Sequence, residues 1–285
     1  MSAPRVLVID GNVAETRRLQ VAAVGYDPGT GYARVLQRLQ TDLQCEVVYA
    51  ADADAAPPPG ASLASYDGVA ITGSALCVSD GGPAVSRQLE LVSAVFDAGV
   101  PLFGSCWGLQ VAVTVAGGAV AANPRGREFG FAHRVLLSEA GREHRLFAGK
   151  PSVFEAPTVH RDYIARLPEG AVPLASNEMG VQAAAFSFRR GTAWGVQYHP
   201  EYDYRDIAAV AGRYGSLLIE MGLFKDTAAL ADFMADLHTL QTAPGESALL
   251  WKYGLGPAMR DPLIRLAELR NWLAAQVLPR HEARR

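Results

Sequence analysis

The first half of the chain alternates short apolar runs with segments whose apolar residues recur at helical spacing. Apolar runs of strand length cover residues 5–10, 46–49, 66–72 and 100–103. Helical stripes lie between and after them, at Tyr32, Val35, Leu36, Leu39 and Leu43, within residues 83–99, and within residues 109–116. Strands separated by helices indicate βαβ units. The pattern therefore predicts an α/β fold, with a mostly parallel central sheet and helices on both faces.

The middle of the chain has a different pattern. Four strand-like runs follow one another there without a helical stripe between them: 132–137, 153–159, 181–188 and 193–198. Strand following strand favours antiparallel pairing, so we expect an added antiparallel strand region. Helical spacing returns from Tyr204. It recurs at 226–240 and 263–277, on either side of a Pro- and Gly-bearing loop at 242–262.

The return to helical spacing predicts a domain boundary near Gly222. We expect one α/β domain over residues 1–222 and a helical C-terminal extension over residues 223–285. We interpret the extension as helices packed on the domain, with a lid or a dimer contact as the alternative. The alternative rests on the apolar stripe at Leu263, Leu266, Leu269 and Leu273, with Trp272 beside it.

Composition and charge exclude several classes of protein. The chain has 285 residues, of which 49% are hydrophobic and 19% charged, and its formal net charge is −3. This balance is typical of a globular protein and argues against a surface for nucleic acid or a polybasic membrane patch. No segment has the length of a bilayer span or the layout of an export signal. With three cysteines in no disulfide or zinc pattern, we expect a reducing cytoplasm, and Cys45 and Cys77 are interpreted as core thiols.

The segment from Gly104 to Gly108 carries the strongest local signal. A predicted strand ends there, the chain turns sharply between two glycines, and a helix begins, which is the arrangement of a nucleophile elbow with Cys106 in place of serine. The N-terminus of a helix stabilises a thiolate. The backbone N–H of Trp107 would face the oxygen of a carbonyl group attacked by Cys106. The alternative is a buried cysteine at the end of a strand.

A second motif follows the predicted strand at 193–198. It brings His199 to the end of that strand, Pro200 ends the strand, and Glu201 lies close enough to reach back to the imidazole. This arrangement supplies a base that is oriented by an acid. Taken alone, the motif would also suit a structural strand terminus. Together, the two motifs supply a nucleophile, a base and an orienting carboxylate.

The two motifs resemble those of the class I, triad-type glutamine amidotransferases. The G-x-C-x-G-x-Q elbow of that family is matched by Gly104, Cys106, Gly108 and Gln110, and its Y-H-P-E segment by Tyr198 to Glu201. Three further stretches resemble stand-alone proteins similar to the amidotransferase half of GMP synthase: Ile71 to Ser74, Gly126 to Gly130 and Thr158 to Asp162. The resemblance covers about residues 5–222.

The resemblance implies hydrolysis of the γ-amide of glutamine, or of a γ-glutamyl compound, through a γ-glutamyl thioester. It implies no metal and no cofactor. Cys106 would be the nucleophile, His199 the base and Glu201 its orienting partner, and the backbone N–H groups of Gly73 and Trp107 would form the oxyanion hole. The residues implied near the amino-acid end of the substrate are Gln110, Phe129, Gly130 and His160. Arg161 stands where the family often has glycine, and we expect it to point to solvent.

Three functions stay open. The first is a glutaminase subunit that passes ammonia to a separate synthetase, because the extension is too short for a synthetase domain. The second is a free-standing hydrolase of γ-glutamyl amides. The third is a noncatalytic binding or regulatory protein, against which the intact Cys106, His199 and Glu201 argue. We expect a small-molecule substrate, a homodimer as one oligomeric option, and neither nucleic acid nor a membrane as a partner.

Overall fold

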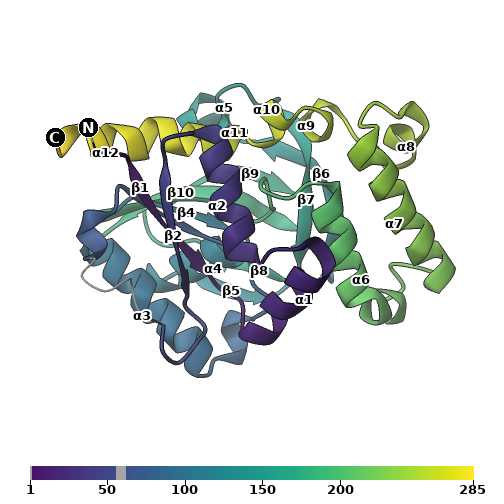
Figure 1. The fold of residues 1–285 in the computed structure, drawn as a ribbon, viewed down its shortest axis with the longest axis horizontal. Helices are drawn as coiled ribbons and strands as arrows, with labels where there is room; N and C mark the ends of the chain where they lie inside the picture. Colours follow the sequence, from purple (N-terminus) through teal and green to yellow (C-terminus); the bar gives the residue numbers. More distant parts are fainter. Residues whose placement is uncertain (1, 56–61) are drawn as a thin grey trace.

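A mixed sheet crosses the centre of the molecule (Figure 1). The computed structural model describes residues 2–55 and 62–285, and within them this sheet has nine strands in the order β2-β1-β3-β4-β11-β10-β9-β6-β7. Its first five strands are parallel: β2 (Gln44–Tyr49), β1 (Arg5–Asp10), β3 (Gly68–Ile71), β4 (Leu102–Ser105) and β11 (Gly191–Val196). The predicted α/β class is therefore confirmed.

The other half of the sheet is antiparallel. It consists of β10 (Gly180–Phe188), β9 (Val172–Asn177), β6 (Glu128–Leu137) and β7 (Val153–His160), as the strand-after-strand pattern predicts. A separate two-stranded sheet pairs β5 (Ala119–Ala122) with β8 (Asp162–Arg166). The sequence pattern missed β5, β8 and β9. In β9 a proline at position 173 and polar residues at its end obscure the strand signal.

Helices cover both faces of the parallel half. Alternate residues of β1 divide between two cores, with Val6 and Val8 under α2 (Pro28–Leu39) and Leu7 and Ile9 under α3 (Pro83–Asp97) and α4 (Trp107–Val115). The α2 helix ends at Leu39, so Leu43 is not part of it and lies buried in the turn before β2. The pattern also missed α1 (Ala14–Val24), whose buried residues are polar. Most of the expected loop at 52–60 lies outside the described residues.

The C-terminal third is more broken than its apolar spacing predicts. After α6 (Tyr204–Glu220) and α7 (Thr227–Thr242), the expected loop contains α8 (Ser247–Lys252) and α9 (Pro257–Arg260). The expected helix at 263–277 is instead α10 (Pro262–Arg265), α11 (Ala267–Trp272), a π-helical turn (Leu273–Val277) and α12 (Leu278–Ala283). Proline at the first position of α9 and of α10 starts a new helix each time. Within the described part of the chain, no helix is long and apolar enough to cross a membrane.

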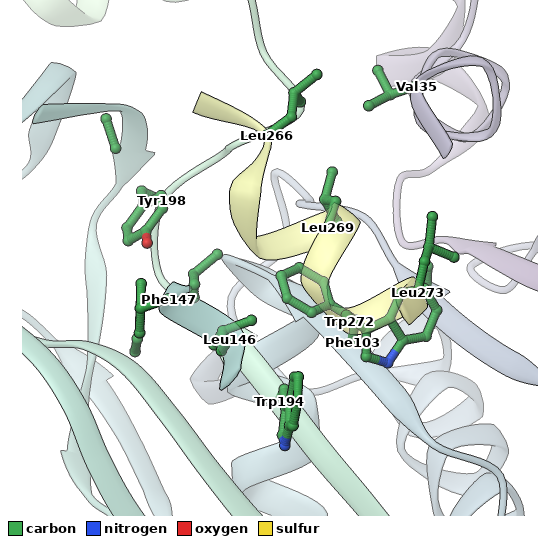
Figure 2. Packing of buried hydrophobic residues seen from close by; sticks show 14 of the residues in the cluster. Val35, Phe103, Leu146, Phe147, Trp194, Tyr198, Leu266, Leu269, Trp272 and Leu273 are labelled. Atoms are coloured by element: carbon green, nitrogen blue, oxygen red, sulfur yellow. The ribbon is translucent and has the colours of Figure 1, made fainter. Parts of the chain in front are cut away.

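The end of the chain packs on the sheet. Figure 2 shows Trp272 surrounded by apolar side chains, with its ring centroid 5.8 Å from that of Phe103. The C-terminal segment lies so close to β3 that a Cβ on Gly68 would be 2.7 Å from a methyl carbon of Val277. The imidazole of His281 contacts the carbonyl oxygen of Ser2 at 3.0 Å, so the two ends of the chain lie side by side (Figure 1). The domain therefore covers most of the apolar stripe of this segment, and the division at residue 222 stays a prediction.

Candidate active site

The parallel strands β1, β3, β4 and β11 end at the same edge of the sheet, where open α/β sheets place their ligands. Gly73 lies just beyond β3, Cys106 directly follows β4, and His199 lies just beyond β11. Glu201 is two residues further on. Strand order alone thus brings together four residues that lie 128 positions apart at the extremes of the sequence (201 minus 73).

Cys106 occupies a strained turn. Its φ is 50° and its ψ is −101°, in a region that side-chain-bearing residues rarely adopt, and its N–H donates to the carbonyl oxygen of Val196 at 2.7 Å. The flanking glycines make the turn sterically feasible. A Cβ on Gly104 would lie 2.3 Å from the carbonyl carbon of Gly108, and one on Gly108 would lie 2.6 Å from the carbonyl oxygen of Ile71. The structure therefore has the elbow geometry that the sequence predicts.

His199 is oriented from one side and unpartnered on the other. Its Nδ1 lies 2.8 Å from Oε1 of Glu201, and both side chains are buried. Its Nε2 has no hydrogen-bond partner among the described residues, and the imidazole lines the same cavity as Cys106. Burial lowers the pKa of His199, but Glu201 and Cys106 together raise it to about 10. Tyr202 stacks on the imidazole, with ring centroids 4.1 Å apart.

A second set of hydrogen bonds holds the carboxylate of Glu201. Ser105 donates its hydroxyl to Oε2 of Glu201 at 3.0 Å, and the Tyr32 hydroxyl lies 3.0 Å from that of Ser105. Both partners are buried. Neither residue was predicted from the sequence. The position of Ser105 next to Cys106 was the one available signal, because α2, which carries Tyr32, meets the elbow only in the folded chain.

The segment after β3 presents the backbone of Gly73 to the imidazole. A Cβ on Gly73 would lie 2.3 Å from Cε1 of His199, so glycine is required for this approach. The carbonyl group of Gly73 accepts a hydrogen bond from Asn12 Nδ2 at 2.9 Å, and Asn12 is itself held by Asp10. Among the described residues nothing accepts from the Gly73 N–H. Trp107 is the first residue of α4, so its N–H has no acceptor within the helix.

Cys106 and His199 line a cavity of about 210 Å³, which we call the catalytic cavity. Gln110 and His160 also line it, as the resemblance implies. Gln110 donates its side-chain amide to the carbonyl oxygen of Asp162 and to Oε1 of Gln197, each at 3.2 Å. His160 is held by Glu128, at 2.8 Å from Nε2. Both side chains are therefore fixed in place at the wall.

Phe129 and Gly130 do not line the catalytic cavity. They belong to β6, and Phe129 packs instead against the rings of Phe224 and Phe233. The residue of this segment that does line the cavity is Arg127, which lies over the ring of Tyr214. Arg213 lines it as well and lies over the same ring. The Nε atoms of both arginines are buried without a hydrogen-bond partner among the described residues. Neither arginine was predicted from the sequence as a site residue.

Two further residues differ from expectation. Cys77 is a residue of the catalytic-cavity wall and not a core thiol. Burial raises the pKa of the Cys77 thiol to about 11, so this thiol is a poor source of thiolate at neutral pH. Arg161 is exposed, as expected, but its Nε also lies 2.9 Å from Oδ1 of Asp162. Within residues 2–55 and 62–285, no group of three or more His, Cys, Asp or Glu side chains is arranged to hold a metal ion.

Comparison with known sequences identifies relatives of this site. Residues 26–208 match the family model "Glutamine amidotransferase class-I". The chain is 34% identical over 228 residues to a γ-glutamyl-L-1-hydroxyisopropylamide hydrolase of Pseudomonas sp., a match that covers 79% of this chain and 77% of the relative. It is 32% identical over 177 residues to the glutamine-hydrolysing GMP synthase of Streptomyces avermitilis, covering 61% of this chain and 31% of that enzyme.

Solved structures share the fold. A glutamine amidotransferase from Thermotoga maritima superposes with a TM-score of 0.65 at 18% identity, over 97% of this chain and 99% of that one. A glutamine amidotransferase from Methylobacillus flagellatus superposes with a TM-score of 0.61 at 20% identity, over 99% of this chain and 95% of that one. From the family match and the sequence relatives, the chain belongs to the class I glutamine amidotransferase family.

Proposed function

We propose that this chain hydrolyses γ-glutamyl amides through a γ-glutamyl thioester on Cys106. The observation that carries the proposal is the geometry at His199. One imidazole nitrogen is held by Glu201, and the other is unpartnered in the cavity that Cys106 lines. A base oriented in this way and placed beside a nucleophile is the arrangement that acyl transfer requires. The presence of Cys106, His199 and Glu201 together also argues against a noncatalytic binding protein.

The reaction proceeds in two acyl-transfer steps. In the first, the thiol proton passes to Nε2 of His199 before the attack, because the raised pKa of His199, about 10, favours the protonated imidazole. Sγ of Cys106 then attacks the γ-carbonyl carbon, and the N–H groups of Gly73 and Trp107 stabilise the oxyanion. His199 then protonates the amide nitrogen, the C–N bond breaks, and the amine leaves. In the second step, water attacks the thioester carbonyl and gives its proton to His199. The C–S bond breaks, glutamate is released, and the thiol regains the proton.

The wall of the catalytic cavity supplies groups for the amino-acid end of the substrate. Arg127 and Arg213 each bring a buried Nε that lacks a partner among the described residues, which suits the α-carboxylate, while Nη1 of Arg213 donates to Gln20 at 3.3 Å. Gln110 and His160 belong to the same wall, and each is held there by a hydrogen bond to the carbonyl oxygen of Asp162. We therefore assign recognition of the glutamyl group to this cavity.

A free-standing γ-glutamyl amide hydrolase is the first candidate. The similarity to the γ-glutamyl-L-1-hydroxyisopropylamide hydrolase extends over 77% of that enzyme, whereas the similarity to GMP synthase extends over 31% of its length. The second candidate is a glutaminase subunit that supplies ammonia to a separate synthetase, which the similarity to GMP synthases favours. A cytoplasmic location and a homodimer remain proposals from the sequence.

The test is glutamate release from glutamine and from a panel of γ-glutamyl amides. We expect at least one γ-glutamyl amide to be cleaved much faster than glutamine, and Cys106→Ala to lose both activities by about 10⁴-fold or more. Cys77→Ala is the matched control, because it removes a second thiol from the same cavity wall. It should keep the activity.

Two results would redirect the assignment. Slow hydrolysis of glutamine alone, again lost in Cys106→Ala, would favour the glutaminase subunit. Hydrolysis that survives in Cys106→Ala would contradict the role of Cys106 in either candidate.

A further inference from the structure

A second and larger cavity lies beside the catalytic cavity. Its volume is about 620 Å³, which is in the range of sites for small molecules. It is enclosed by the junction of α1 and α2, one face of α2, the segment from Glu201 into α6, and Arg265 of α10. We call it the amine-side cavity. None of the residues assigned above to the glutamyl group lines it.

The two cavities are contiguous. Four residues line both of them: Gln20, Pro28, Gly73 and Tyr202. Two of these four contact the catalytic imidazole, since Tyr202 stacks on it and Gly73 lies against its Cε1. In the proposed reaction His199 protonates the departing nitrogen. The amine half of the substrate therefore leaves the scissile bond beside the shared wall, with the amine-side cavity beyond it.

The carboxylates and the arginines of the amine-side cavity differ in how many partners they have within the protein. Its three carboxylates are engaged within the protein. Glu201 is held by His199 and Ser105, Asp203 caps α6, and Asp206 accepts from the hydroxyl of Tyr26 at 3.2 Å and the N–H of Asp203 at 3.0 Å. Burial, reinforced by Asp203, also raises the pKa of Asp206 to about 7, so this carboxyl group carries only part of a charge at neutral pH.

The arginines of the same cavity have fewer partners, except for Arg205, which donates to the hydroxyl of Tyr26 at 3.0 Å and lies 3.8 Å from Oδ2 of Asp203. Four line it: Arg34, Arg38, Arg205 and Arg265. Within the described part of the chain, the side chains of Arg38 and Arg265 make no hydrogen bond or ion pair, and Nε of Arg265 is buried. Arg34 lies over the ring of Tyr26 and makes no ion pair with any described residue. Burial lowers the pKa of Arg265, although the carboxylates of Asp203 and Asp206 act in the opposite direction without forming an ion pair with it.

We propose that the amine-side cavity binds the leaving-amine half of the substrate and selects an amine that carries an anionic group, with Arg265 and Arg38 as its partners. This inference rests on the proposed function and specifies its substrate class. Planar guanidinium groups recognise carboxylate and phosphonate oxygens in the same way, so the shared chemistry is a compact oxyanion. Arg265 comes from the C-terminal extension, which thereby contributes to the site.

The experiment compares γ-glutamyl conjugates that differ only in the charge of the amine. The probes are conjugates of glycine, β-alanine and 4-aminobutyrate, their primary-amide counterparts, and the conjugate of 2-aminoethylphosphonate. We expect kcat/KM for the acid to exceed that for the matched amide by at least about tenfold at one or more chain lengths. Comparison of kcat/KM for the 2-aminoethylphosphonate conjugate with kcat/KM for the carboxylate conjugates shows which oxyanion is preferred.

Variants of Arg265 and Arg38 test whether these two residues cause the preference for acidic amines. In Arg265→Gln the acid-to-amide ratio should fall to within about twofold of one, whereas Arg265→Lys should recover part of it. Arg38→Gln, a change at an exposed position, provides the same test if the Arg265 variants fold poorly. Arg18→Gln is the matched control, since Arg18 is exposed on α1 and lines neither cavity. It should keep the wild-type ratio.

The contradictory outcomes are distinguishable. Cleavage of the neutral amides as fast as the acids at every chain length would overturn the anionic-amine proposal and leave γ-glutamyl hydrolysis standing. A wild-type preference for acids that survives in Arg265→Gln and Arg38→Gln would overturn the assignment to this cavity. Failure to cleave any γ-glutamyl conjugate would instead contradict the proposed function, and the inference with it.

Discussion

The catalytic cavity and the amine-side cavity share a wall but are built differently. The first has a volume of about 210 Å³ and is formed largely at the ends of strands, where backbone turns place Gly73, Cys106 and His199. The second is about three times larger, at about 620 Å³, and is formed by helices whose long side chains reach into it. Backbone geometry therefore positions the reacting groups here, whereas side chains from distant segments set the substrate specificity.

The two cavities also differ in their dependence on the C-terminal extension. The catalytic cavity takes no residue from it, whereas Arg265 lines the amine-side cavity. Lys150 fixes the position of that segment. Its buried ammonium group donates to the carbonyl oxygens of Ile264 and Arg265, at 3.1 and 3.3 Å, and pairs with the buried carboxylate of Glu268. The extension is therefore part of the selective side of the site.

Among variants that keep Cys106, His199 and Glu201, Gly73→Ala should produce the largest effect on activity, and it acts on the catalytic side. The new Cβ would lie 2.3 Å from Cε1 of His199, so the imidazole or the oxyanion N–H must move. We expect kcat to fall by about 10²–10³-fold for every substrate, as for the loss of one oxyanion donor. Gly245→Ala, where a Cβ meets no heavy atom within 4 Å, should change nothing. Equal activity in the two variants would refute the assigned role of Gly73.

Lys150→Met should act on the selective side. It leaves the carboxylate of Glu268 buried without its cation, which costs about 3–5 kcal/mol in the free energy of unfolding. It also frees the segment that carries Arg265, so the preference for acidic amines should weaken at a temperature where the variant is folded. Lys252→Met is the control, since its ion pair with Asp236 is exposed and should contribute about 1 kcal/mol or less. Urea unfolding and the acid-to-amide ratio measure the two effects. A Lys150 variant as stable as the Lys252 variant would contradict this role.

The third prediction concerns the change in stability with pH. Burial lowers the pKa of His199, but Glu201 and Cys106 raise it further, from 6.5 to about 10. The folded chain therefore holds this proton more tightly than the unfolded chain. The resulting stabilisation is complete below about pH 6.5 and is lost as the pH rises toward about 10. We expect the free energy of unfolding of the wild type to fall as the pH rises across this range, and to fall less steeply in Glu201→Gln. Identical slopes in the two proteins would exclude an effect of Glu201 on the pKa of His199.

The sequence predicts much of the catalytic side because its determinants are local. Cys106 lies in an elbow defined by two nearby glycines, and Glu201 is two residues from His199, so neighbouring positions in the chain carry the geometry. The α/β class follows in the same way from alternating strand and helix patterns. Gln110 and His160 also lie where the family resemblance places them. For the site residues, the information lies within one turn or one motif.

The remainder of the site could not be predicted because it depends on contacts between distant segments. Tyr32 supports Ser105 only after α2 packs on β1, and Arg265 reaches the amine-side cavity only after the extension folds against the domain. The resemblance implies backbone contacts from Phe129 and Gly130 to the substrate, but neither residue lines the catalytic cavity, the ring of Phe129 packs against Phe224 and Phe233, and Arg127 of the same segment lies at the wall. The division of residues 242–283 into several short helices was not predicted either, because the apolar spacing continues across the prolines that start new helices.

The central claim is a γ-glutamyl thioester on Cys106, and acid quenching during turnover tests it most directly. Wild-type protein would be mixed with excess γ-glutamyl amide, quenched within the first turnovers, digested, and analysed by peptide mass spectrometry. We predict one γ-glutamyl group on the peptide that contains Cys106, together with a burst of free amine, and no adduct on the peptide that contains Cys77. Turnover without an adduct on Cys106, or with the adduct on Cys77, would contradict the account.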